Sequence, residues 1–201
     1  MKPDEPETRA LIHAGAFDSL GPAGDHAGLL WQLVRRRSKS LKVVKKTPID
    51  TLFTESTTES APEFPPGSEL ERLRRQFAVL GFLTDRHPMV LFTDALPSGL
   101  VKAAHLAGRL GRRVRLAGWL ITGKIVGTKT GEKMEFLTFE DETGVVETTF
   151  FPRVYQRFCH MLDWGRPYIL AGRVEEDFGA ITLTVDQVSP IMPIKSLKKT
   201  G

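Results

Sequence analysis

The spacing of apolar residues divides the chain into a helical first part and a β-rich second part. Within residues 1–37, Leu29, Leu33 and Val34 recur at the three- and four-residue spacing of an amphipathic helix. The segment 19–21 ends in glycine and interrupts the pattern that precedes it. We therefore expect two short helices that form a hairpin over residues 1–37.

A polar stretch separates this hairpin from the next helix. Residues 38–68 contain TESTTESAPEFPPGS, which has few apolar side chains to bury, and they predict a flexible linker. A helix is expected to begin after Ser68, where Glu71 completes the sequence pattern of a capping box, and to end at Gly81. Its apolar stripe consists of Leu70, Leu73, Phe77 and Leu80.

The segment before the β-rich part is expected to be helical as well. Pro88 prevents the preceding helix from continuing through that point. A further helix is expected over residues 98–109, with Ser98 as its cap. Residues 69–109 are therefore expected to form a helical connector.

From residue 112 onward, apolar residues recur at every second position, which indicates β-strands. The expected strands are 114–121, 134–140, 145–151, 168–174 and 181–188. A helix that opens at Pro152 lies between the third and the fourth of these, with four inward residues, Val154, Tyr155, Phe158 and Leu162. The order βββαββ is that of an OB-fold, a five-stranded Greek-key barrel. The expected fold class is a mainly β OB-fold over residues 110–190, with an N-terminal α-helical segment and a basic tail over 191–201.

The segment between the first two strands, residues 122–133, is expected to be a glycine-rich basic loop or the tip of a hairpin. Its lysines alternate with glycines, so the backbone can approach a phosphate chain closely. In OB-folds this loop and the exposed faces of strands two and three line the ligand groove. The candidate phosphate-binding residues are Lys124, Thr128, Lys129 and Lys133.

The second strand carries the candidate for contact with a base. Alternation places Phe136 and Phe139 on opposite faces, with Thr138 on the face of Phe136. An outward Phe136 would offer a stacking surface for a base. The alternatives are that Phe139 faces outward and Phe136 belongs to the core, or that both are buried, because phenylalanine on a strand is usually a core residue. The residues alone leave these arrangements open.

The charges form local clusters and do not make the whole chain basic. The formal net charge is +4 and the pI is about 9.3. The densest cluster is residues 35–46, with seven cations and no anion, and a second one consists of Lys195, Lys198 and Lys199. Both could bind phosphates by counterion release, or be a solvated linker and a solvated tail.

Enzyme signatures are absent from the sequence. Five scattered histidines and a single cysteine, Cys159, form no spaced set of metal ligands. The loop 122–133 fails the spacing of a P-loop, because Thr128 occupies the position of the second glycine. His160 follows Cys159 on an expected helix and points another way, and Asp141 fits the turn that follows it. We expect no catalytic centre, no metal and no cofactor.

The length of the apolar runs, the first ten residues and the cysteine count indicate the compartment. No run of 18 apolar residues exists, so no membrane span is expected. The first ten residues are acidic and contain proline, which is not typical of a signal peptide. One cysteine excludes an internal disulfide and fits a reducing compartment. With 41% hydrophobic and 26% charged residues, a packed cytoplasmic protein is expected.

Four segments, in order along the chain, resemble one known family. They are LIHAGAFDSL at 11–20, QFAVLGFLTDRHPM at 76–89, GTKTGEKMEFLTFEDETG at 127–144 and FFPRVY at 150–155. They resemble the helix-hairpin-helix and OB-fold part of the bacterial DNA polymerase III alpha subunit, over roughly residues 7–190. The resemblance implies an OB domain that contacts single-stranded template DNA.

The chain also departs from that family. Nothing in it resembles the catalytic aspartates of the polymerase palm or the metal-binding histidines of the family's phosphoesterase-like domain, and the chain is several-fold too short to hold those domains. The resemblance therefore implies a stand-alone or split piece. Such a piece could keep a contact with single-stranded DNA, but it could not carry out nucleotidyl transfer.

A more distant similarity concerns the second and third strands. Residues 136–141 and 145–147 are similar to the anticodon-binding OB domains of class II aminoacyl-tRNA synthetases. The matching phenylalanine of those domains lies in the base-binding groove, which implies the same place for Phe136. No synthetase catalytic domain is present, so the similarity implies no synthetase activity.

The expected function is that of a non-enzymatic module that binds single-stranded DNA in replication or repair synthesis. The lysines of the loop would bind phosphates, Phe136 would stack on a base, and Thr138 and Glu147 would hydrogen-bond base edges. The residues do not separate DNA from RNA. Three alternatives stay open: an adaptor that docks on DNA polymerase III subunits or a sliding clamp, the C-terminal piece of a split polymerase, and a relic without function.

Overall fold

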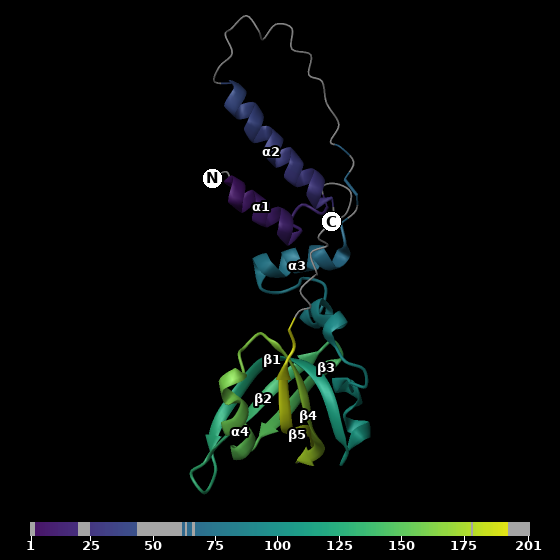
Figure 1. Ribbon diagram of the computed structural model, residues 1–201, viewed down its shortest axis with the longest axis vertical. Coiled ribbons are helices and arrows are strands. Elements are labelled where there is room, and N and C mark those ends of the chain that lie inside the picture. The colour runs from purple at the N-terminus through teal and green to yellow at the C-terminus, as the bar shows by residue number, and fades with distance from the viewer. Residues whose placement is uncertain are drawn as a thin grey trace, which may run out of the picture. The chain divides into compact units, whose positions relative to one another are not determined.

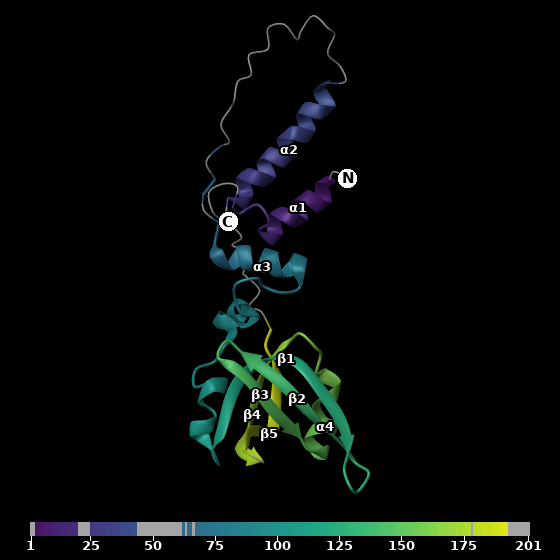
Figure 2. The ribbon, with the colours of Figure 1, turned by 180° about the vertical axis from the view of Figure 1, so that it is seen from behind.

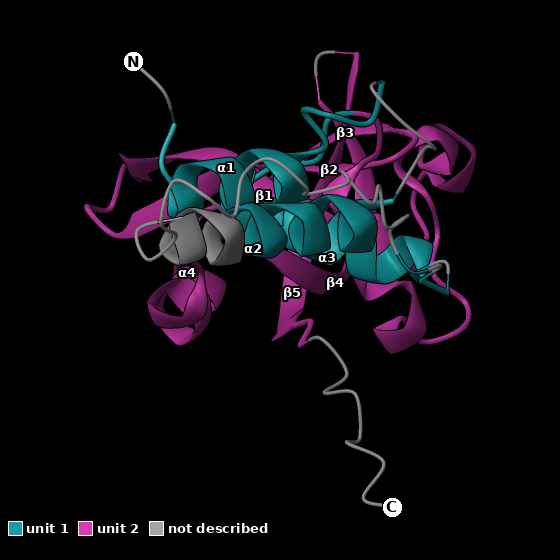
Figure 3. Cartoon of the chain, turned by 90° about the horizontal axis from the view of Figure 1, so that it is seen from above, with its two compact units in different colours: residues 1–84 teal, residues 85–201 magenta. Residues whose placement is uncertain are grey.

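The computed structural model describes residues 3–19, 25–43, 62, 64–65, 67–177 and 179–192, and for residues 37–43 it describes the backbone alone. The contacts between residues divide the chain into two units, 1–84 and 85–201, which Figure 3 distinguishes by colour. The division falls inside the segment 69–109 that was expected to be one connector. The basic tail from residue 193 onward and most of the expected linker lie outside the described residues.

Within its described residues, the first unit has three helices: α1 (Glu5–Ala14), α2 (His26–Val43) and α3 (Glu69–Leu80). Gln76 of α3 is buried, and its side chain joins two other segments. Its Nε2 donates to the Ala14 carbonyl oxygen at 3.0 Å, and its Oε1 accepts from the Thr84 amide at 3.4 Å. A second link is the 2.8 Å contact between His26 Nε2 and Asp18 Oδ1.

One helix boundary and one helix cap differ from the expected ones. Helix α2 continues to Val43, so the expectation that a linker starts at residue 38 is wrong for its first six residues. Ser68 is the N-cap of α3 as expected, but its side chain makes no capping hydrogen bond. The capping box is found at α1, where Asp4 and Glu7 each accept from the other's amide.

The expectation of a helix over residues 98–109 is wrong. The structure has a 3₁₀ helix at Pro88–Ala95 and two 3₁₀ turns, Ala103–His105 and Ala107–Arg109. The amide of Ala103 donates to Asp141 Oδ2 at 2.9 Å, and that of Ala104 donates to Thr143 Oγ1 at 3.1 Å. Because the turn between strands supplies these acceptors, the segment is held against the barrel and cannot form a continuous helix.

The second unit is a closed five-stranded barrel, visible from opposite sides in Figures 1 and 2. Its strands are β1 (Arg113–Gly127), β2 (Lys133–Asp141), β3 (Gly144–Phe150), β4 (Pro167–Asp177) and β5 (Ala180–Pro190). The neighbour order is β1-β2-β3-β5-β4, and β4 closes the barrel against β1. Helix α4 (Pro152–Phe158) lies between β3 and β4 in the chain. The expected OB-fold is confirmed.

The core of the barrel comes from the inward positions of every strand. Alternate residues of β2 and β3 are almost fully buried: Leu137, Phe139, Val146, Thr148 and Phe150. The one polar member, Thr148, donates to the Leu137 carbonyl oxygen at 2.7 Å, so its buried hydroxyl is satisfied. Phe158 of α4 packs against this core, together with the half-buried Tyr155.

The segment 122–133 is mostly strand, so of the two expected arrangements, a loop or the tip of a hairpin, the structure has the hairpin. Strand β1 runs to Gly127, where it pairs with Lys133, and only residues 128–132 connect the strands. Gly123 explains the pairing. A Cβ at this position would lie 2.2 Å from Leu137 Cδ2, so the glycine leaves room for a core side chain of β2.

Candidate nucleic-acid interface

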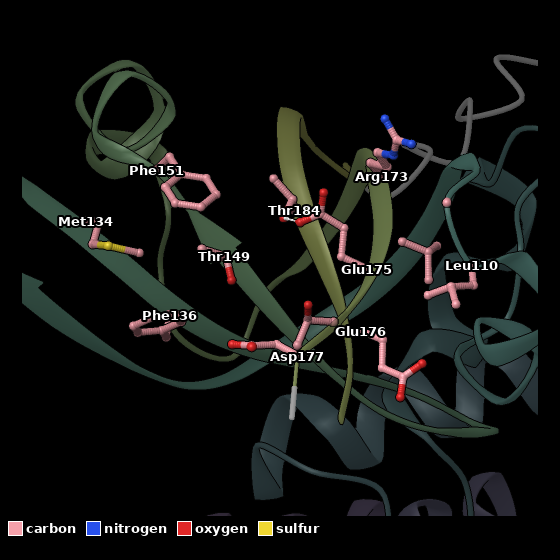
Figure 4. A pocket seen from close by; sticks show the side chains of 13 residues that line it. Leu110, Met134, Phe136, Thr149, Phe151, Arg173, Glu175, Glu176, Asp177 and Thr184 are labelled. Atoms are coloured by element: carbon pink, nitrogen blue, oxygen red, sulfur yellow. Dashed lines mark hydrogen bonds between the residues drawn. The ribbon is translucent and has the colours of Figure 1, made fainter. Parts of the chain in front are cut away.

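A groove with a volume of about 690 Å³ crosses the outer face of the barrel over β2, β3, β5 and β4. Phe136 and Met134 of β2 line it from one side, as Figure 4 shows, together with Phe151, which follows β3. Arg173 and Glu175 of β4 line the other side. The groove therefore brings together strand residues that are up to 50 positions apart in the sequence, from Met134 to Thr184.

The pairing of the strands explains why these residues meet. Cross-strand partners share one face of a sheet. Lys124 pairs with Phe136, Phe136 with Thr149, Thr149 with Thr184 through the parallel β3–β5 pair, and Thr184 with Arg173. These five residues form one outward row across all five strands. Four of them, all but Lys124, line the groove.

The aromatic side chains of the groove are accessible. Phe136 is 42% exposed and Phe151 is 48% exposed, whereas Phe139 is fully buried in the barrel. The expectation that Phe136 faces outward and Phe139 inward is confirmed. A phenyl ring on a strand face, with an open surface beside it, has the geometry that base stacking needs.

Thr138 and Glu147 are cross-strand partners in the row next to Phe136. The hydroxyl of Thr138 lies within 2.9 Å of Glu147 Oε1 and 3.0 Å of Oε2. Glu147 is exposed, whereas Thr138 is 9% exposed and its hydroxyl already has a partner. Neither residue is among those that line the groove. A contact with base edges stays a prediction, and Glu147 has the more accessible atoms for it.

The structure separates the predicted cations from one another. Lys124 lies beside Phe136, whereas Lys133 begins β2 and Lys129 lies in the short β1–β2 connection. In the described part of the chain, none of these three lysines takes part in an ion pair. The Thr128 hydroxyl accepts from the Glu132 amide at 3.1 Å, so it shapes the turn. Its role in binding stays a prediction.

Sequence reasoning missed the side of the groove that β4 and β5 form. Thr184 and Arg173 belong to it, and so do three carboxylates at the end of β4: Glu175, Glu176 and Asp177. Glu175 Oε2 accepts from the Thr184 hydroxyl at 2.6 Å. The polar alternation of β5 was the available signal, but only the β3–β5 pairing brings it next to Phe136.

Two pKa shifts arise on the barrel outside the groove. Burial raises the pKa of Glu135, which pairs with Phe150 on the strand face opposite to Phe136. Burial also raises the pKa of Tyr155 in α4, with smaller contributions from Cys159 and Glu135. Neither side chain lines the groove, so neither shift bears on contact with a ligand there.

The described residues contain no group of three His, Cys, Asp or Glu side chains that could hold a metal ion. Asp141, which could be mistaken for half of a carboxylate pair, accepts from the Thr143 amide at 2.8 Å and so caps the β2–β3 turn. None of the helices in the described ranges is both long and apolar enough to span a membrane.

Comparison with known proteins agrees with this geometry. Residues 114–191 match the family described as "OB-fold nucleic acid binding domain". The chain is 33% identical to the DNA polymerase III subunit alpha of Halalkalibacterium halodurans over 188 residues, and 30% identical to the error-prone DNA polymerase of Anaeromyxobacter dehalogenans over 184 residues. Each match covers 90% of this chain. The resemblance to the DNA polymerase III alpha subunit is therefore confirmed.

The matches cover only a small part of those polymerases. The chain spans 16% of the length of the first relative and 15% of the second. Among solved structures, a domain of replication protein A from Methanococcus maripaludis aligns with 41% of this chain and 86% of its own, at 18% identity and a TM-score of 0.36.

Proposed function

We propose that this chain, an OB-fold related to the OB region of DNA polymerase III alpha subunits, binds single-stranded DNA through the groove on β2, β3, β4 and β5. One observation carries the proposal: Phe136 and Phe151 expose their rings in the same groove. Buried aromatic rings stabilise a core, but exposed rings in a hollow offer stacking surfaces that every base can use. The family match over residues 114–191 supports the same ligand class.

The charges of the groove favour a division of roles. Among the lining residues that the structure describes, Arg173 is the one cation, against the carboxylates of Glu175, Glu176 and Asp177. This end of the groove therefore repels phosphates, and bases rather than phosphates are expected to lie in it. Lys124 is the cross-strand partner of Phe136 and lies outside the lining, so it provides a cation for the phosphate backbone of the DNA whose bases occupy the groove.

We propose no catalytic centre for the chain. It resembles about one sixth of a polymerase, and the groove presents rings, hydroxyl groups and a few charges on the outer face of a barrel. The proposed task is to hold a strand during DNA replication or repair synthesis in the cytoplasm.

Association with a polymerase assembly is a second proposal. The similarity to polymerases extends beyond the barrel, since it covers 90% of the chain and so includes part of the helical unit. Val79 and Phe82 are exposed apolar residues at the end of that unit. They would contact polymerase subunits or a clamp while the barrel holds DNA.

The stacking role is tested by Phe136→Ala in the full chain. Loss of one stacking ring is expected to weaken binding of oligothymidylate by about 1–3 kcal/mol, roughly five- to more than a hundred-fold, with little change in salt dependence. Binding is measured by fluorescence anisotropy at several salt concentrations. The matched control is Phe82→Ala, which removes an exposed ring from the helical unit (55% exposed, against 42% for Phe136) and is expected to bind like the parent.

The phosphate contacts are tested separately. Lys124→Ala is expected to lower the slope of log affinity against log salt by up to about 0.7, the value for one phosphate of a single strand. Lys129→Ala and Lys133→Ala show whether the far end of the β1–β2 hairpin contributes as well. If Phe136→Ala binds as tightly as the parent at every salt concentration, stacking on Phe136 is excluded.

A further inference from the structure

A second hollow, of about 610 Å³, lies at the start of β1 and is lined by arginines. Arg109, Arg112, Arg113 and Arg115 contribute to it, together with Gly99, Val101, Val114, Ala171 and Gln187. All four arginines are exposed. No carboxylate is among the lining residues that the structure describes. Four cations around one hollow repel one another, so the arrangement favours an anionic ligand.

The backbone holds these arginines in place. The Val101 amide donates to the Arg115 carbonyl oxygen at 2.7 Å, which fixes the wall formed by residues 99–101. The Gly111 amide donates to the Val174 carbonyl oxygen at 2.9 Å, and the Val174 amide donates to that of Arg112 at 3.0 Å. The backbone positions of Arg112 and Arg115 are therefore set by hydrogen bonds within the barrel before any ligand arrives.

Most of the positive charge is not neutralised within the protein. Arg113 Nη2 lies 2.7 Å from Asp186 Oδ1. Across the described ranges, Arg109, Arg112 and Arg115 have no ion-pair partner. Guanidinium groups bind phosphate oxygens through two parallel hydrogen bonds, so three free guanidinium groups suit a phosphate chain.

The arginine hollow adjoins the groove. Arg113 lines the hollow, Arg173 lines the groove, and the two are cross-strand partners in the β1–β4 pair. The carboxylates of the groove lie on the same strand, beyond Arg173. The phosphates of a nucleic acid whose bases lie in the groove would be repelled by those carboxylates on β4. They would be attracted by the arginines at the start of β1, the neighbouring β-strand.

We propose that Arg109, Arg112 and Arg115 form a second phosphate-binding site, which takes the backbone of a nucleic-acid strand as it leaves the groove. The inference rests on the proposed function, since the strand is the one whose bases occupy the groove. The protein then contacts more nucleotides than the groove alone would hold. The additional nucleotides are bound through their phosphates, independently of base sequence.

The experiment uses the full chain and oligothymidylates of about 4 to 16 nucleotides, the range of site sizes for an OB-fold. The triple variant Arg109→Gln, Arg112→Gln, Arg115→Gln is compared with the parent. For the longest strands, the salt slope of the variant is expected to be smaller by about two, since each of three lost phosphate contacts removes about 0.7. For the shortest strands that bind, parent and variant are expected to have equal affinity.

The matched control is Arg75→Gln, Arg157→Gln, Arg166→Gln, which removes three exposed arginines that already have partners: Glu71, the Phe158 ring and Asp163. Its salt slope is expected to depend on oligonucleotide length as that of the parent does.

An equal decrease of the salt slope in both triple variants, or no decrease in the first, would overturn the inference and leave the proposed groove unaffected. A parent that binds no strand of any length would overturn the proposed function as well. If the triple variant does not fold, Arg112→Gln and Arg115→Gln are measured singly, each with an expected slope change of about 0.7.

Discussion

Phe136 and Glu135 are neighbours on β2, and the strand gives them opposite environments. Phe136 faces the groove, whereas Glu135 lies on the opposite face, where burial raises the pKa of its carboxyl. This face carries the core residues Leu137 and Phe139. A carboxylate there opposes folding when it is ionised, because it loses part of its hydration.

Glu135→Gln is therefore expected to change how stability depends on pH. The folded barrel binds the proton of Glu135 more tightly than the unfolded chain, whose carboxyl has the ordinary pKa of 4.5. The free energy of unfolding of the parent accordingly falls as the pH rises through 4.5 toward the raised pKa, and the variant lacks this loss. Between about pH 4 and pH 7, the melting temperature of the variant minus that of the parent is expected to increase as the pH rises. A difference in melting temperature that stays constant, or that decreases as the pH rises, would contradict a raised pKa of Glu135.

The residue scale also shows what strand alternation can predict. A period of two places Phe136 and Phe139 on opposite faces, but it does not say which face is the core. The structure assigns the inner face to Phe139 because Leu137 and the partner strand's Val146 and Phe150 point the same way. Arg173 could not be predicted as a groove residue, since β4 reaches the groove only through the β4–β5 and β3–β5 pairs.

At the scale of elements, glycines decide where strands can pair. Gly123 and Gly127 give residues 122–133 the composition of a loop, but most of the segment is strand, and Gly123 serves core packing there. The expected helix over 98–109 was wrong. Its amides are satisfied by Asp141 and Thr143, which are distant in sequence and are brought near only by the closed barrel.

Gly172 is the glycine at which an added side chain would clash most directly with a paired strand. A Cβ at Gly172 of β4 would lie 2.2 Å from the Thr184 carbonyl oxygen of β5, and a backbone atom of a paired strand cannot move aside easily. We expect Gly172→Ala to destabilise the barrel by about 3 kcal/mol or more. The control is Gly127→Ala, where no heavy atom lies within 4 Å of the added Cβ and the expected change is within about 0.5 kcal/mol. Urea unfolding of both variants measures the difference, and similar midpoints would show that β4 and β5 are not paired as described.

At the scale of the whole molecule, the barrel holds a complete core of its own. Every member of its buried cluster lies between Leu106 and Val188, and the helical unit buries a separate set that includes Ile12 and Leu73. The two sets fall on either side of the division between Thr84 and Asp85. Two separate cores indicate two units that can fold independently.

A fragment of residues 85–201 is therefore expected to fold alone. It should unfold in one cooperative thermal transition and show the near-ultraviolet circular dichroism of packed aromatic residues, such as the edge-to-face pair of Phe139 and Tyr168. A fragment with secondary structure but without that signal would be a molten globule, and would indicate that the helical unit completes the barrel core.

The central claim is that a single strand occupies the groove on the outer face of β2, β3, β4 and β5. Nuclear magnetic resonance of the isotope-labelled full chain, titrated with an oligothymidylate, tests it most directly. The largest shifts of backbone amides are expected on Phe136, Thr149, Phe151 and Thr184, with small shifts in the helical unit. Shifts that are confined to residues 5–84, or that avoid these four residues at saturation, would contradict it.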